Sequence, residues 1–154
     1  MNGITADTFA PQRNTTRAEF ATVIWRLEGS PAPTGANPFA DCQTHWSKDA
    51  VAWAFENGIV NGIDATHFAP NNNITREQMV TMLYRYVGEP PVTGNLNAFT
   101  DAGSVSAYAR NAMIWGVQNG VITCRTATTL APKGLATRAE LATILHRFDL
   151  MLKG

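Results

Sequence analysis

The 154-residue sequence has no excess of charge of either sign and few charged residues overall. Twelve lysines and arginines balance twelve aspartates and glutamates, and charged residues make up 16% of the chain. A protein that binds nucleic acid through bulk charge carries a basic excess, so the composition disfavours that class. The apolar share of 45% is high enough for a packed core, which argues against disorder.

Long apolar runs are also missing. No run reaches the roughly 18 residues of a membrane-spanning helix, and the opening MNGITADTF lacks the charged and apolar regions of a secretory signal peptide. Two interpretations follow: either the protein is cytoplasmic, or the chain is an excised piece of an exported protein.

Residue patterns typical of catalysis and metal binding are absent as well. Cys42 and Cys124 are too few to decide the redox compartment and too far apart for a paired metal motif. Two free thiols are favoured over a disulfide, because nothing in the sequence places these residues together. The histidines do not recur in the repeat described next, and the scattered acidic residues form no acid/base pair. We therefore expect no enzyme activity, no metal site and no cofactor.

What the sequence does contain is one pattern written three times, as TTRAEF, ITREQM and ATRAEL. In the first copy Thr16 and Glu19 have the spacing of a helix capping box. The equivalent pairs are Thr75 with Gln78 and Thr137 with Glu140. The copies recur about every 60 residues, a period typical of repeat architectures whose units bury their apolar faces against one another.

Each cap is followed by apolar residues at i, i+3, i+4 and i+7, which indicates one face of an amphipathic helix. Gly29 and Gly88 follow the first two helices at a position suited to a left-handed C-cap. The third helix has Asp149 at the preceding position, and we expect it to continue through LMLKG.

A second helix precedes the cap in the later two copies. The aligned segments predict helices over 46–56 and 108–118, each ending at Asn-Gly. The first copy lacks this helix, although residues 2–11 match the turn at 61–70. We interpret the chain as two and a half repeats at 1–30, 37–90 and 97–154, joined by Pro/Gly-rich connectors.

An arginine at the first position of each repeated helix is unexpected, because the positive end of the helix dipole disfavours a cation. These residues are Arg17, Arg76 and Arg138. One hypothesis is that each arginine, together with the unpaired N–H groups of the helix end, holds an anionic ligand. The alternative is that it is solvated or pairs with a carboxylate such as Asp41 or Asp101.

Other repeated residues have a structural and a functional interpretation. Trp46 and Tyr108 could stack on a sugar ring or simply pack, whereas Trp53 and Trp115 are expected in the core. Asp41 and Asp101 could cap the following segment or orient the arginine, the former being favoured. Gly58 and Gly120 serve turn geometry or allow close ligand approach. Arg26, Arg85 and Arg147 are assigned to an exposed or interface face.

The complete unit, with Phe-x-Asp, an aromatic-led helix ending in Asn-Gly, a Phe/Leu-x-Pro turn and Thr-Arg-Ala-Glu, resembles the S-layer homology (SLH) domain. This resemblance covers almost the whole chain in register. It implies a mostly α-helical fold with three helix-loop-helix repeats in a pseudo-threefold arrangement around a central helical bundle. It also implies carbohydrate-binding grooves between repeats, in which the motif arginines meet an acidic ketal.

The resemblance implies non-covalent anchoring, outside the cell, to a bacterial cell wall or S-layer through an acidic, pyruvylated secondary cell-wall polysaccharide. The expected glycan-contacting residues are Arg17, Arg76, Arg138, Trp46, Tyr108, Asp41, Asp101, Gly58 and Gly120. Neither nucleic acid nor membrane insertion is expected, and the incomplete first repeat could allow self-association. The alternative function is a protein–protein assembly module of a surface layer that does not bind glycan itself.

Overall fold

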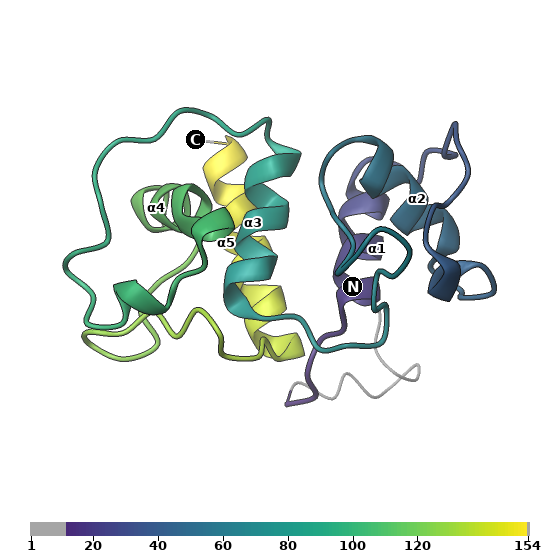
Figure 1. Ribbon diagram of the computed structural model, residues 1–154. Helices are drawn as coiled ribbons and strands as arrows, with labels where there is room; N and C mark the ends of the chain where they lie inside the picture. Colours follow the sequence, from purple (N-terminus) through teal and green to yellow (C-terminus); the bar gives the residue numbers. More distant parts are fainter. Residues whose placement is uncertain (1–11, 154) are drawn as a thin grey trace.

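The computed structural model describes residues 12–153, and within this range the protein is mostly α-helical (Figure 1). The helices are α1 (Arg17–Leu27), α2 (Lys48–Glu56), α3 (Arg76–Tyr86), α4 (Arg110–Gln118) and α5 (Arg138–Lys153). Short 3₁₀ turns lie at η1 (Ala40–Cys42), η2 (Ala102–Ser104) and η3 (Ala107–Ala109). No helix in this range is long and apolar enough to cross a membrane. The predicted first-repeat turn, residues 2–11, lies outside the described residues.

The predicted capping boxes form at the start of α1 and α3. The Thr16 hydroxyl accepts from the Glu19 N–H, and the Glu19 carboxylate accepts from the Thr16 N–H. Thr75 and Gln78 make the same reciprocal pair. Each box satisfies two N–H groups that the first helical turn cannot pair, which fixes where these helices begin.

The helix ends also follow the sequence. Gly29 and Gly88 adopt positive φ angles of 86° and 91° just after α1 and α3, as expected for left-handed C-caps. Gly58 and Gly120 do the same after α2 and α4, with φ of 73° and 69°. Without such a glycine, α5 continues to Lys153.

The predicted starts of the two first-type helices were wrong by two residues. Both helices were expected to begin at the aromatic residue, yet α2 begins at Lys48 and α4 at Arg110. Tyr108 belongs instead to the 3₁₀ turn η3, which the Ala109 N–H closes on the Ser106 carbonyl. The aromatic side chains therefore lie ahead of the helices.

Each first-type helix packs against the capped helix of the preceding repeat: α2 against α1 and α4 against α3 (Figure 1). Trp53 and Trp115 are 8% and 4% exposed, so their predicted place in the core is confirmed. The Phe148 ring of α5 lies 6.1 Å from the Tyr86 ring and 6.4 Å from the Trp115 ring. These contacts draw α3, α4 and α5 into one core.

The three segments just before the capped helices also meet one another. Thr15 donates its N–H to the Ala136 carbonyl, Ala136 to Ile74, and Ile74 back to Thr15, with N–O distances of 2.8, 3.1 and 2.8 Å. These residues are equivalent in the repeat, so each segment contacts both others. The pseudo-threefold arrangement of whole repeats stays a prediction, and this closed ring of hydrogen bonds agrees with it.

Candidate functional site

The three motif arginines are buried rather than displayed on the surface. Arg17, Arg76 and Arg138 are 9%, 6% and 4% exposed. Arg17 and Arg76 extend away from their own helix ends into the turn of the next repeat. Carbonyl groups of that turn offset the unfavourable field of the helix N-terminus.

Arg17 bonds to the turn of the second repeat. Its Nε donates to the Phe68 carbonyl at 3.0 Å and its Nη2 to the Asn61 carbonyl at 3.1 Å. The guanidinium also lies 4.6 Å above the centre of the Phe68 ring, a cation–π contact. Burial lowers the pKa of Arg17 below its ordinary value, and the group stays protonated because an arginine begins so high.

Arg76 repeats these contacts one junction later and adds an ion pair. Its Nε donates to the Leu130 carbonyl at 2.9 Å and its Nη2 to the Thr123 carbonyl at 2.8 Å. Its Nη1 bonds to the Glu140 carboxylate at 2.6 Å. Arg138 likewise directs Nη1 to the Glu19 carboxylate at 3.2 Å. For these two arginines pairing with a carboxylate is therefore observed.

The carboxylates that pair with the arginines are not the aspartates named from the sequence. Asp41 accepts from the N–H groups of Phe68 and Ala69 at 3.0 and 2.9 Å. Asp101 accepts from those of Leu130 and Ala131 at 2.9 and 2.8 Å. Ala69 and Ala131 have φ angles of 60° and 50°, so each aspartate holds a strained turn in place.

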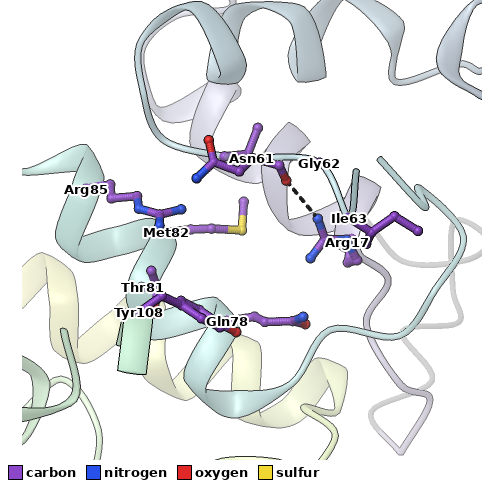
Figure 2. A pocket seen from close by; sticks show the side chains of 10 residues that line it. Arg17, Asn61, Gly62, Ile63, Gln78, Thr81, Met82, Arg85 and Tyr108 are labelled. Atoms are coloured by element: carbon purple, nitrogen blue, oxygen red, sulfur yellow. Dashed lines mark hydrogen bonds between the residues drawn. The ribbon is translucent and has the colours of Figure 1, made fainter. Parts of the chain in front are cut away.

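An open pocket of about 450 Å³ lies beside Arg17, between the first two repeats and next to the third (Figure 2). The lining residues come from α1, the turn after α2, α3 and η3. They are Arg17, Val60, Asn61, Gly62, Ile63, Gln78, Thr81, Met82, Arg85 and Tyr108. The pocket thus joins Arg17 and Tyr108, two residues that the sequence nominated separately.

The charge inside this pocket is positive. Among residues 12–153, the charged lining residues are Arg17 and Arg85, and none of the lining residues carries a carboxylate. Arg85 pairs with Glu89, an exposed residue of the following loop whose carboxylate lies 4.0 Å from Nε. The sequence assigned Arg85 to an exposed or interface face, and the structure places it in the lining of this pocket between repeats.

Tyr108 contributes an aromatic face that is 53% exposed. Burial of its hydroxyl, together with the nearby Glu77 carboxylate, raises the pKa of Tyr108 to about 12. The hydroxyl is therefore neutral at physiological pH, and its interaction with Glu77 leaves the ring face as the part of Tyr108 that the pocket presents. Glu77 is itself 1% exposed and is held by Lys133 and the Ser106 N–H.

The remaining nominated residues lie outside the lining of this pocket. Trp46 is 64% exposed, with its ring 5.1 Å from that of His45. Gly58 and Gly120 face open space at helix ends, which accounts for them as turn residues. Cys42 and Cys124 are both free thiols. Within residues 12–153 no group of three or more His, Cys, Asp or Glu is placed to hold a metal ion.

Comparison with known proteins identifies the repeat. The sequence profile of the S-layer homology domain matches residues 1–21, 38–80 and 98–142, which is more than half of the chain. The surface-layer 125 kDa protein of Lysinibacillus sphaericus is 35% identical over 146 residues, covering 90% of this chain and 12% of that protein.

Other relatives carry different names. The amylopullulanase of Thermoanaerobacterium thermosulfurigenes is 34% identical, covering 95% of this chain and 8% of its own length. A cellulosome-anchoring protein of Acetivibrio thermocellus is 28% identical, covering 66% of this chain and 24% of its own. The chain thus spans a small part of each relative. It belongs to the S-layer homology domain family, whose members are binding modules that anchor proteins to the cell wall at the bacterial surface.

Proposed function

We propose that this chain anchors its protein by binding an acidic, pyruvylated cell-wall polysaccharide in the pocket beside Arg17. The observation that carries the proposal is the pocket's charge: the described residues of the lining include two arginines and no carboxylate. A carboxylate placed there gains charge-assisted hydrogen bonds from guanidinium groups that are partly shielded from water. A neutral glycan would gain nothing from this charge.

The rest of the lining suits a pyruvyl ketal on a sugar. A ketal presents a carboxylate beside a methyl group, and Met82 and Val60 offer apolar surface next to the arginines. The exposed ring of Tyr108 and the side chain of Ile63, which is 61% exposed, offer faces on which a sugar ring can pack. Charge and apolar surface together favour this ligand over a simple inorganic anion.

The test is co-sedimentation with purified bacterial wall sacculi that carry pyruvyl ketals, before and after mild acid treatment to remove them. We expect binding to untreated sacculi and its loss after treatment. Arg85→Ala should weaken binding by about tenfold or more, because it removes one charge-assisted partner worth about 1.5–3 kcal/mol.

Arg147→Ala is the matched control, since Arg147 is the equivalent of Arg85 in the third repeat and bonds to Thr123 instead. We expect it to bind as the wild type does. Binding that ignores both acid treatment and Arg85→Ala would contradict the glycan proposal and favour an assembly module that binds protein.

A further inference from the structure

The arginines at the junction of the first two repeats and at the junction of the last two make equivalent contacts through two of their three nitrogen atoms. Arg17 and Arg76 each use Nε and Nη2 on two carbonyls of the next repeat's turn, at distances between 2.8 and 3.1 Å. The third donor group, Nη1, differs. In Arg76 it bonds to Glu140, whereas within residues 12–153 the Nη1 of Arg17 makes no hydrogen bond. Both arginines are buried, so the difference lies in the partner.

The partner is always the residue at the third position of a capped helix. Glu140 of α5 pairs with Arg76, and Glu19 of α1 pairs with Arg138. The equivalent residue of α3, which lies across the pocket from Arg17, is Gln78 (Figure 2). One amide thus stands where the other two repeats have a carboxylate.

The two carboxylate oxygens of Glu19 have different partners. Oε1 of Glu19 accepts from the Thr16 N–H to complete the capping box, while Oε2 receives the arginine. In Gln78 the single oxygen already accepts from the Thr75 N–H at 3.0 Å. The atom left over is the amide nitrogen, which is a donor and cannot accept from Arg17. The capping box is kept, but among residues 12–153 no carboxylate forms an ion pair with Arg17.

We propose that Gln78 is the residue that makes the Arg17 pocket an acid-binding site, whereas Glu140 and Glu19 block the equivalent arginines with an internal carboxylate. This inference rests on the proposed function and adds which junction binds and why. At Gln78 both the arginine Nη1 and the amide nitrogen remain as donors for a carboxylate from outside. At the glutamate positions that place is already taken.

The decisive variant is Gln78→Glu, which supplies the carboxylate found in the other repeats. Glutamate serves the same capping box at Glu19, so the fold is expected to persist, and thermal unfolding followed by circular dichroism checks this. We expect at least about a tenfold loss of binding to untreated sacculi, the size of one charge-assisted partner removed and one like charge added.

Glu140→Gln makes the opposite change at the other junction and is the matched control. It leaves the Arg17 pocket untouched, so binding to untreated sacculi should not fall. If the wild type binds acid-sensitively and folded Gln78→Glu binds equally well, the inference about Gln78 is overturned while the glycan proposal stands. If the wild type itself shows no acid-sensitive binding, the glycan proposal fails first.

Discussion

The junction between the first two repeats and the junction between the last two share a framework but differ where they meet solvent. In both, a buried arginine ties one repeat to the turn of the next, and an aspartate holds that turn by two N–H groups. The differences are Gln78 against Glu140, Gly62 against Cys124, and Ile63 against Arg125. The repeated contacts build the fold, and we propose that the substituted positions determine what each junction binds.

The equivalent arginines of the two junctions, Arg76 and Arg17, differ in how many of their donor groups are occupied. Arg76 is occupied on all three donor groups, and Arg125 adds a second cation to Glu140 at 2.7 Å. Arg17 makes the same contacts to carbonyl groups, and within residues 12–153 its Nη1 makes no hydrogen bond. If the proposal is correct, one buried arginine both ties two repeats together and binds the ligand, depending on one residue of the neighbouring repeat.

The largest difference in stability is expected from removing the two arginines. Arg76→Ala should lower the free energy of unfolding by about 3 kcal/mol, the lower end of the cost of breaking a buried ion pair, because Glu140 keeps Arg125. Arg17→Ala, which loses two carbonyl bonds and the contact with the Phe68 ring but no ion pair within residues 12–153, should cost about 2 kcal/mol. Urea denaturation followed by tryptophan fluorescence measures both, and equal costs would contradict the claimed difference in pairing.

A smaller change in stability is expected from exchanging the residue types at the equivalent turn positions Gly62 and Cys124. A Cβ at Gly62 would lie 2.4 Å from the Phe39 ring and from the Asp64 carbonyl oxygen, and 2.5 Å from the His67 carbonyl oxygen. Gly62→Ala should therefore cost about 2 kcal/mol through overpacking.

At the other junction Cys124 already carries a Cβ and is exposed, and the aromatic residue equivalent to Phe39, Phe99, is only partly buried. Cys124→Gly should cost less than about 1 kcal/mol, the ordinary penalty for backbone freedom. Thermal unfolding of the two variants side by side is the measurement. A Gly62→Ala variant as stable as the wild type would show that the first junction is not the tighter one.

The smallest change in stability is expected from replacing Asp41 or Asp101, and it should be the same at both junctions. Burial raises the pKa of Asp41 and of Asp101, but the backbone N–H donations to each outweigh it, so both pKa values lie below the ordinary one. A carboxyl whose pKa is lower in the folded state stabilises the protein above its unfolded pKa, about 3.9, and loses that contribution as pH falls through the folded pKa.

Asp41→Asn and Asp101→Asn should each cost about 1 kcal/mol at pH 7. Their difference from the wild type should shrink once the pH falls below about 4. Urea titrations between pH 7 and 3 test this, with the two variants expected to agree. A loss of stability in only one of the two variants would show that the two aspartates do not contribute equally to the free energy of unfolding.

The sequence predicted the framework because its signals are local. Capping boxes, C-cap glycines and apolar spacing depend on residues within one or two turns of helix, so the positions of α1, α3 and α5 could be predicted from the amino-acid sequence. The starts of α2 and α4 were placed too early because an aromatic residue looks the same in a 3₁₀ turn and in a helix. The position of Arg85 in the pocket lining was not predicted for a different reason: it depends on which face of α3 the first repeat leaves open.

By itself the sequence determined that the chain is a helical repeat, where its capped helices begin, and that three arginines occupy one recurring position. Only the tertiary structure decided what those arginines do, because their partners lie 44 to 64 residues away in the chain, or 119 in the case of Glu19. Spacing along one helix cannot tell whether a side chain of the next repeat presents a carboxylate oxygen or an amide nitrogen to a guanidinium. That choice depends on how the repeats pack. Among residues 12–153 the Nη1 group of Arg76 is bonded to Glu140, whereas that of Arg17 makes no hydrogen bond.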